Sequence, residues 1–224
     1  MALCFQLHHS FLPVSFKFQN PKSHKLARNI ITASSSSSSS SITSKEAQLA
    51  KNDLLDLISN EERGIKTQGN LSKQSKIIKA IEAMEVLGKN SITTESSSLS
   101  ATWRMLWTTE KEQLFIIKNA YLFGTQTGDV LQVIDVEKRI LNNVITFPPS
   151  GVFFVRSSIE IASPQRVNFR FTSAVLRGEN WEFPLPPFGQ GWFESVYLDY
   201  EIRVAKDIRG DYLVVNRAPY KWKE

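Results

Sequence analysis

From Ala101 to Asn216 the sequence is rich in aromatic and β-branched residues that alternate with polar ones. Residues 167–172, for example, read VNFRFT, with apolar residues at every second position. A period of two places successive side chains on opposite faces of a β-strand. This part of the chain is therefore expected to form a β-sheet with one apolar face.

Turn signals divide this region into about eight expected strands, at residues 102–109, 113–118, 130–136, 139–147, 152–161, 167–172, 192–205 and 212–216. The intervening segment 178–191, rich in proline and aromatic residues, is expected to be a loop. In the strand 192–205 the inward residues are expected to be Val196, Leu198, Tyr200, Ile202 and Val204, with Tyr197, Asp199, Glu201 and Arg203 outward. Short links and one apolar face predict an antiparallel meander that closes into a barrel.

Two amphipathic helices are expected before the sheet, at residues 45–59 and 72–88. Their apolar residues recur at helical spacing, namely Leu54, Leu55, Ile58, Ile77, Ile81 and Met84. Ser72 is the predicted N-cap of the second helix, and Gly64 and Gly88 are the predicted helix stops. The polar segment 89–100 is expected to be a linker.

The first 45 residues contain no Asp or Glu, five Lys or Arg, a run of eight serines, all three histidines and the single cysteine. Such a leader is typical of a chloroplast transit peptide, and a disordered tail is the alternative. The predicted domains are therefore a transit peptide with a Ser-rich linker (1–45), N-terminal helices and linker (46–100), and a β-barrel (101–224). Residues 46–224 are expected to act together as one domain.

The composition of the remaining chain narrows its function. Without the five leader cations the chain has 22 basic and 22 acidic residues, which argues against binding to nucleic acid. Because residues 46–224 contain no His and no Cys, disulfides, His or Cys metal sites and Ser-His or Cys-His dyads are excluded there. No enzyme activity, cofactor or metal site is expected. No apolar run approaches the ~20 residues of a membrane-spanning helix.

Aromatic residues are the strongest candidates for a functional site. Trp103, Met105 and Trp107 share one side of their expected strand, where they either fill the core or line a lipid pocket. The whole predicted lining comprises Trp103, Met105, Trp107, Phe169, Phe171 and Leu198. Arg217 is expected to stack on Trp103 through a cation–π contact.

The loop 181–192 contains a second aromatic group, made of Trp181, Phe183, Phe188 and Trp192. It is interpreted either as a packed lid or as a surface for a membrane or a partner protein. The pair Asp199 and Glu201 is expected to be solvated or ion-paired, with Arg203 as the candidate partner. An enzyme that uses Asp199 and Tyr197 is the weaker alternative.

Several segments resemble the plastid lipid-associated protein, or fibrillin, family. The helix LLDLI at 54–58, the strand WRMLWTT at 103–109, the segment SPQRV at 163–167 and the triplets YLD at 197–199 and RGD at 209–211 carry the resemblance in chain order. Ala101 and Trp107 stand where the family usually has Gly and Tyr. The matching signature residues are Arg104, Asp135, Arg166, Tyr197, Asp199, Arg203, Gly210 and Arg217.

The resemblance implies a mainly β fold, an antiparallel lipocalin-like β-barrel preceded by an α-helical hairpin. It implies a non-enzymatic plastid protein that binds a prenyl lipid or another hydrophobic small molecule. The segment 186–193 is most similar to the fibrillin five subgroup, which implies support of plastoquinone biosynthesis by assistance to a long-chain prenyl diphosphate synthase. The alternative is a structural coat of plastoglobules or thylakoid lipid surfaces. The implied location is the chloroplast stroma, with thylakoid or plastoglobule association.

Overall fold

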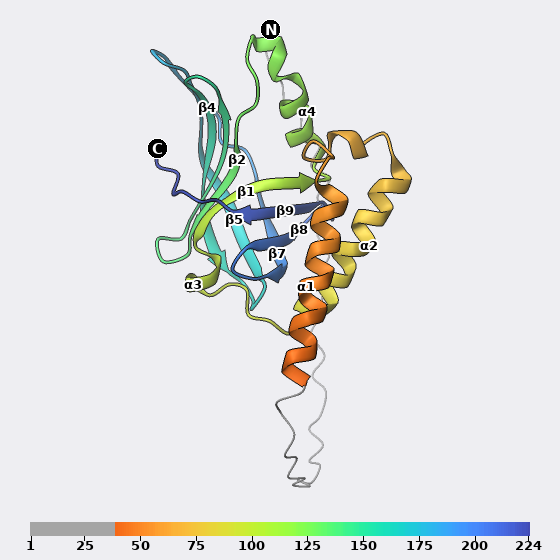
Figure 1. Cartoon of the computed structure of the whole chain (residues 1–224). Helices are drawn as coiled ribbons and strands as arrows, with labels where there is room; N and C mark the ends of the chain where they lie inside the picture. Colours follow the sequence, from red (N-terminus) through yellow and green to blue (C-terminus); the bar gives the residue numbers. More distant parts are fainter. Residues whose placement is uncertain (1–38) are drawn as a thin grey trace, which may run out of the picture. The chain divides into compact units, whose positions relative to one another are not determined.

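Nine strands among residues 39–224, which are the residues that the structure describes, form one antiparallel sheet that closes on itself (Figure 1). The structure is a computed structural model. The predicted transit peptide lies, up to residue 38, outside the described residues. In chain order the elements are α1 (Ser39–Ile58), η1 (Ile65–Thr67), α2 (Leu71–Gly88), α3 (Ser96–Leu99), β1 (Ala101–Thr108), α4 (Lys111–Asn119), η2 (Ala120–Phe123), β2 (Val130–Asp135), β3 (Ile140–Phe147), β4 (Gly151–Ile161), β5 (Arg166–Arg177), β6 (Glu182–Leu185), β7 (Gln190–Leu198), β8 (Ile202–Asp207) and β9 (Tyr212–Arg217).

The sheet is a ring of eight strands with a ninth on its edge. Its strand order is β4-β3-β2-β1-β9-β8-β7-β5-β6, and β4 also pairs with β5. That additional pairing closes the ring and leaves β6 outside it, attached to β5 alone. Closure satisfies the backbone groups that an open sheet would expose at its edges. The predicted fold, an antiparallel barrel after a helical hairpin, is confirmed.

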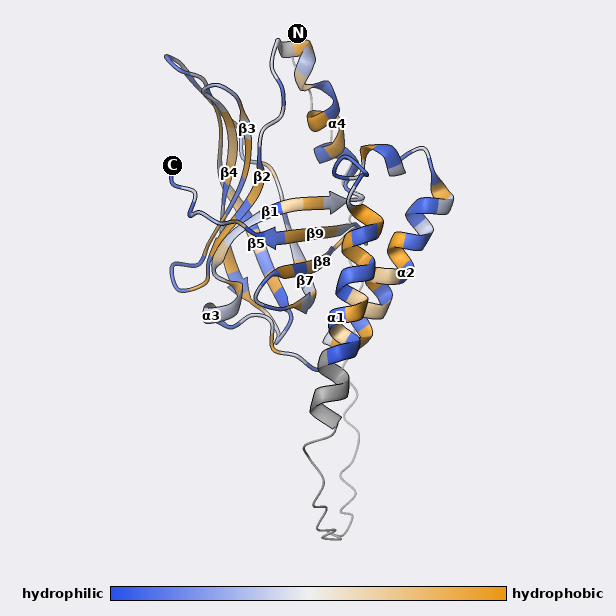
Figure 2. Ribbon diagram, viewed as in Figure 1, coloured by the Kyte–Doolittle hydropathy of each residue, from blue (hydrophilic) through white to orange (hydrophobic). Residues whose placement is uncertain are grey.

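The helical hairpin covers the outer face of β7, β8 and β9. Leu54 and Ile58 of α1 and Ile77, Ile81 and Met84 of α2 are buried in one cluster with Val196, Ile202, Val204, Tyr212 and Val214. Figure 2 shows both helices carrying hydrophobic and hydrophilic residues along their length, as amphipathic helices do. The predicted apolar faces of both helices are therefore confirmed.

The boundaries of α2 depend on two small residues. The N-cap is Asn70, two residues before the predicted Ser72, and its Oδ1 accepts a 3.0 Å hydrogen bond from the backbone N–H of Lys73. Its end at Gly88 is as predicted. A Cβ at Gly88 would collide with the backbone carbonyl of Val196, so glycine lets the end of α2 lie directly against β7.

Several predicted strand assignments are wrong. Residues 113–118 belong to α4, because six residues that include four apolar ones suit a short amphipathic helix as well as a strand. The expected strand 192–205 is two strands, β7 and β8, joined by a turn in which Tyr200 is 82% exposed. The expected linker contains α3, and the expected loop 178–191 contains β6.

Two helices close the opposite ends of the ring (Figure 1). At one end, Leu99 of α3 is buried in a cluster with Trp103, Ile134 and Phe193. At the other, Ile116 and Ile117 of α4 pack against a cluster of Met105, Val130 and Ile145. The space inside the sheet is thus occupied by side chains from both directions, as expected for a barrel of eight strands.

Candidate functional site

A β-bulge in β1 separates the two tryptophans that the sequence places on one side. Met105 lies opposite Val215 of β9 and Trp107 lies opposite Val214, so Leu106 is an extra residue. A bulge shifts all following side chains to the other face of the strand. Trp103 therefore lies inside the ring, whereas Trp107 lies outside it under the helical hairpin, where its Nε1 donates to Thr67 Oγ1 at 3.2 Å. The prediction that Trp107 lines the interior is wrong.

The other predicted lining residues lie on the inner face of the sheet. Met105 is buried in the cluster beneath α4. Phe169 and Leu198 are half-buried and pack against the cluster that contains Trp103. Phe171 shares the face of Phe169 on β5, and the two rings stack with their centroids 5.4 Å apart. The five remaining members of the predicted lining thus share one inner face.

Trp103 is held by a hydrogen bond and by a cation–π contact. Its Nε1 donates to the backbone carbonyl of Leu99 at 2.9 Å. The guanidinium carbon of Arg217 lies 4.6 Å from the centre of the indole ring, as the predicted cation–π contact requires. Arg217 is fixed in turn, because its Nε and Nη2 donate to the carbonyls of Tyr200 and Ser98 at 2.8 and 2.9 Å.

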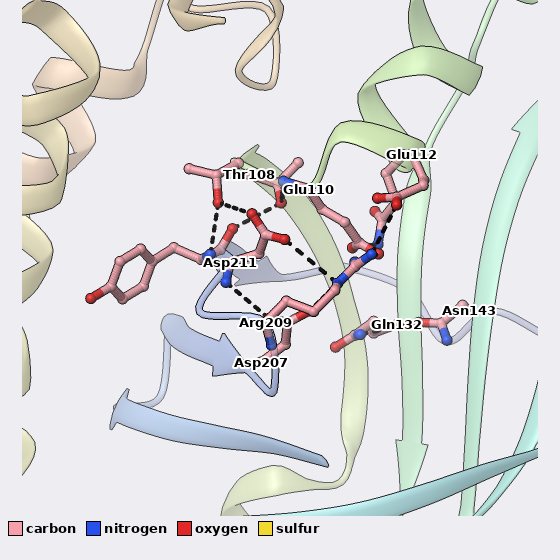
Figure 3. Close-up of polar contacts among 11 residues, drawn as sticks. Thr108, Glu110, Glu112, Gln132, Asn143, Asp207, Arg209 and Asp211 are labelled. Carbon is pink, nitrogen blue, oxygen red and sulfur yellow. Dashed lines mark hydrogen bonds and ion pairs between the residues drawn. The ribbon is translucent and has the colours of Figure 1, made fainter. Parts of the chain in front are cut away.

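A row of polar side chains crosses the interior. Arg203 points into the ring and is fully buried, contrary to the prediction that it faces outward. Its Nη2 donates to Oε1 of Gln132, and Nε2 of Gln132 donates to Oδ1 of Asn143 at 3.0 Å. Figure 3 shows Gln132 and Asn143 on their neighbouring strands. The Arg203–Gln132–Asn143 row is thus a polar layer in an otherwise apolar interior.

The Arg203 guanidinium is short of partners within this layer. Its Nε and Nη1 have no hydrogen-bond acceptor in the structure. The guanidinium carbon lies 5.5 Å from the ring centre of Trp103 and 5.2 Å from that of Phe193. Burial lowers the pKa of Arg203 to about 9, because an apolar environment disfavours the charged form.

The signature residue Asp199 organises the turn between β7 and β8. Its carboxylate accepts from the backbone N–H groups of Glu201 and Ile202 at 2.7 and 2.8 Å. Lys51 of α1 donates to Asp199 at 3.0 Å and to Glu201 at 2.6 Å. The ion pair predicted for this acidic pair exists, but Lys51 supplies the cation instead of Arg203. The turn is thereby attached to the helical hairpin.

The pKa values of Asp199 and Tyr197 fit groups that stabilise the turn, not groups that transfer protons. Although burial raises the pKa of Asp199, the hydrogen bonds from Ile202 and Lys51 hold it below its ordinary value. Burial raises the pKa of Tyr197 to about 12, and its hydroxyl donates to Asp199 at 3.2 Å. A phenol with this pKa stays protonated near neutral pH, which suits a hydrogen-bond donor better than a general base.

The remaining signature residues make local contacts. Arg104 donates to Asn216 at 3.4 Å, and Asp135 accepts from the backbone N–H of Lys138 at 2.9 Å. Arg166 pairs with Glu194 at 2.7 Å. Gly210 adopts φ 83° in the turn between β8 and β9, a conformation that favours glycine.

An acidic cluster around Arg209 attaches α4 to the end of the ring (Figure 3). Arg209 in the β8–β9 turn donates to Glu110 at 3.0 Å and to Glu112 at 2.9 Å, on either side of the start of α4. Asp207 and Asp211 lie 3.4 and 3.6 Å from Arg209 Nε. Burial raises the pKa of Glu110 to about 7, although Arg209 opposes the shift. Sequence reasoning missed this cluster.

The aromatic loop divides into exposed and packed members. Trp181, Phe183 and Phe188 are 55%, 59% and 73% exposed. Trp192 is half-buried on β7, with the Arg166 guanidinium 4.0 Å from its ring centre. The first three, all within eight residues of one another, form the exposed aromatic patch of β6 and its flanks.

Hollows of about 250 and 480 Å³ occur on the described part of the chain. Val136 and Ile159 line the smaller, and Tyr121 and Pro148 line the larger. Neither is lined by a predicted pocket residue. Among residues 39–224 there is no group of His, Cys, Asp and Glu suited to a metal ion. None of the helices described is long and apolar enough to cross a membrane.

Comparisons with known proteins give one family and one curated relative. The model of the PAP_fibrillin family matches residues 48–216. A protein of Arabidopsis thaliana named probable plastid-lipid-associated protein 11, chloroplastic, is 73% identical over 184 residues, which cover 82% of this chain and 86% of the relative. No solved structure matches the chain. The family match begins within α1 and ends one residue before the end of β9, so it includes α2 and the other strands of the ring in full.

Proposed function

This chain belongs to the PAP/fibrillin family, and from that premise we propose that it is a non-enzymatic plastid protein that binds lipid. The observation that carries the proposal is the exposed aromatic patch of Trp181, Phe183 and Phe188 beside a ring with an apolar interior. Exposed apolar side chains grouped within a short segment favour contact with a lipid surface or a partner. Burial of each ring in lipid contributes about 1.5–3 kcal/mol.

The proposal assigns two steps to two parts of the fold. The aromatic patch contacts the lipid surface. An isoprenoid or prenylquinone chain then enters the ring and contacts Trp103, Met105, Phe169, Phe171 and Leu198. Because Ile116 and Ile117 of α4 cover the interior at one end, we propose that α4 moves to admit the chain.

Vesicle binding tests the surface step. We expect the triple variant Trp181→Ser, Phe183→Ser, Phe188→Ser to lose at least about tenfold in affinity for vesicles of plastid galactolipids, measured by co-sedimentation. The matched control replaces three exposed apolar residues of the helical hairpin, Leu49, Leu71 and Val86, by serine. The control should bind as the unaltered chain does. Equal losses in both variants would show that the patch has no special role.

Tryptophan quenching tests the interior step. A short-chain plastoquinone analogue should quench the unaltered chain saturably. Met105→Trp, which adds volume to the packed cluster beneath α4, should weaken the binding without loss of vesicle association. Quenching that fails to saturate with the unaltered chain would contradict an interior site.

A structural coat of plastoglobules is the second candidate function, and the exposure of the patch at the β6 edge favours it. A coat protein needs the patch and no interior site. Saturable quinone binding by the unaltered chain distinguishes the two, because it exists only in the first, whereas Met105→Trp should float normally with isolated plastoglobules in either case.

The finer role that the family resemblance implies is assistance to a long-chain prenyl diphosphate synthase in plastoquinone biosynthesis. We propose that the chain takes up the apolar product, which otherwise leaves the enzyme slowly because of its large apolar area. Added chain should raise the steady-state turnover of the synthase without changing its pre-steady-state burst. An unchanged turnover would remove this role and leave lipid binding intact.

We propose further that residues 1–45 direct the protein to the chloroplast. A fluorescent fusion to residues 1–45 should be imported and cleaved, whereas a fusion to residues 46–224 should stay outside. Fractionation of the imported protein into stroma, thylakoids and plastoglobules then decides its place in the organelle.

A further inference from the structure

Arg203 is a cation buried in the ring without an anion. Its side chain is 0% exposed, and of its five N–H donors those on Nε and Nη1 meet no acceptor. Only Nη2 is used, toward Gln132. Since a buried cation without a partner destabilises a fold by several kcal/mol, the contact with Gln132 alone does not explain its presence.

The surroundings of Arg203 contain rings instead of carboxylates. Trp103 and Phe193 lie within 5.5 Å of the guanidinium. Burial is the whole cause of its lowered pKa, and no neighbouring acid raises it again. The negative charge that would complete this site is therefore not supplied by the described chain.

Three other cations of the fold are paired with acids. Lys51 has Asp199 and Glu201, Arg209 has four acids, and Arg166 has Glu194. Arg217 contacts the same indole ring, that of Trp103, and donates to two carbonyls. Of the five cations compared, Arg203 is therefore the one that has guanidinium nitrogens without a hydrogen-bond acceptor and no acid beside it.

We infer that Arg203 binds the carboxylate of a single-chain amphiphile whose apolar chain lies inside the ring. Nε and Nη1 lie on different edges of the guanidinium, and a carboxylate at either edge would form a charge-assisted hydrogen bond with the free donor there. One unpaired cation matches one negative charge. A diphosphate would leave further charge unpaired in an apolar interior, at a high cost in free energy.

Gln132 is the positioning residue of this site. It holds the Arg203 guanidinium through its Oε1, and its own amide is fixed by Asn143. Its rotation is thereby restricted, which holds the Arg203 guanidinium in one orientation. The inference rests on the proposed function in one respect, namely that the ring admits a lipid chain.

Calorimetric titration of the full-length chain with oleate, methyl oleate and oleyl alcohol tests the inference. The unaltered chain should bind oleate roughly 10- to 100-fold more tightly than either neutral analogue, the range that charge-assisted hydrogen bonds produce. Arg203→Met should remove that preference. It should keep or raise the melting temperature, because an apolar residue replaces an unpaired buried charge.

Arg217→Met is the matched control, since Arg217 contacts the same indole with its donors already used. It should lower the melting temperature and keep the preference for oleate. Arg203→Lys should retain a reduced preference. If Arg203→Met melts lower and still prefers oleate, Arg203 is structural and the inference is wrong. If the unaltered chain binds all three ligands equally, the inference fails and lipid binding stands; if it binds none of them and no quinone, both fail.

Discussion

At the scale of the residue, the polar side chains of the ring interior differ in whether their hydrogen-bond donors are satisfied. Trp103 satisfies its indole N–H, fills the end of the core near α3 and is in contact with two guanidiniums. Arg217 has its donors satisfied, whereas Arg203 does not. Stability and binding are thus expected to depend on different arginines around one ring.

Trp103→Ala and Arg217→Ala should each destabilise the domain. The tryptophan variant should lose about 3–5 kcal/mol because it creates a cavity. A double-mutant cycle by urea denaturation should give a coupling free energy of about 0.5–2 kcal/mol, as a partly desolvated cation–π pair does. A double variant that loses the plain sum of the two single losses would exclude an energetic contact.

Glu110 should make stability depend on pH. Burial raises its pKa to about 7, Asp207, Glu112 and Asp211 add to the rise, and Arg209 opposes it. Because the folded pKa exceeds the unfolded one, the stabilising contribution is full below about pH 4.5 and is lost as the pH rises through 7. The free energy of unfolding should fall between pH 5 and 7, and Glu110→Gln should remove that fall.

Urea titrations at several pH values measure this slope. The matched control is Glu112→Gln, because Glu112 contacts the same guanidinium from a more exposed position. That variant should keep most of the slope of the unaltered chain, because Glu112 contributes less than burial to the raised pKa of Glu110. A slope that persists in Glu110→Gln would assign the pH dependence to another group.

The sequence alone could not place Arg203 on the correct face. Ile202, Arg203, Val204 and Ala205 are all buried, because one face of β8 meets the helices and the other meets the ring interior. A strand covered on both sides loses the alternation on which a facing prediction depends. The interior positions of Trp103, Met105, Phe169 and Phe171 were predictable, because β1 and β5 alternate up to their bulges. Leu198 follows the bulge in β7, so alternation from Val196 does not lead to its inner face.

At the scale of the element, bulges and short helices decide where a predicted side chain goes. The extra residue Leu106 moves Trp107 from the ring to the helical hairpin. A second bulge between Ser195 and Tyr197 turns Val196 toward the same helices. Neither bulge contains a glycine or proline that would indicate its position. The sequence therefore predicted the strands but not the change of face of the side chains that follow each bulge.

We expect α4 to open more readily than the other helices that pack on the ring. Arg209→Ala removes the contacts with Glu110 and Glu112 that attach its first turn. Because these side chains are partly exposed, the loss of global stability should be about 1 kcal/mol or less. Amide hydrogen exchange of residues 111–119 should nevertheless rise, and lipid uptake should quicken. Arg139→Ala, a change in the β2–β3 turn, is the control and should leave exchange in α4 unchanged.

At the scale of the whole molecule, two parts of the outer surface of the ring are covered by other segments of the chain. The helical hairpin covers one side, and the C-terminal Trp222 packs on Leu131, Val144 and Phe154 on another. Its ring centre lies 6.3 Å from that of Phe154. The architecture was predictable from strand count and turns, whereas the outer layer formed by the last residues was not, since KWKE has no periodicity to read.

Trp222→Ala should lower the free energy of unfolding by about 1.5–3 kcal/mol, because it uncovers the apolar cluster around Phe154. The matched control, Trp181→Ala, changes a tryptophan that is more than half exposed and should stay within about 0.5 kcal/mol of the unaltered chain. Denaturation in urea measures both. Equal losses would show that the tail contributes no more than a surface residue.

The pairing of β1 with β9 has a kinetic consequence. Residues 103–108 pair with residues 213–217, so the first strand of the ring finds its neighbour only when the last strand is present. Contacts between positions so distant along the chain slow folding. A nascent or translocating chain must therefore hold β1 to β8 as an open sheet, with two unpaired edges, until its final dozen residues arrive. That waiting period is when this protein should depend most on chaperones.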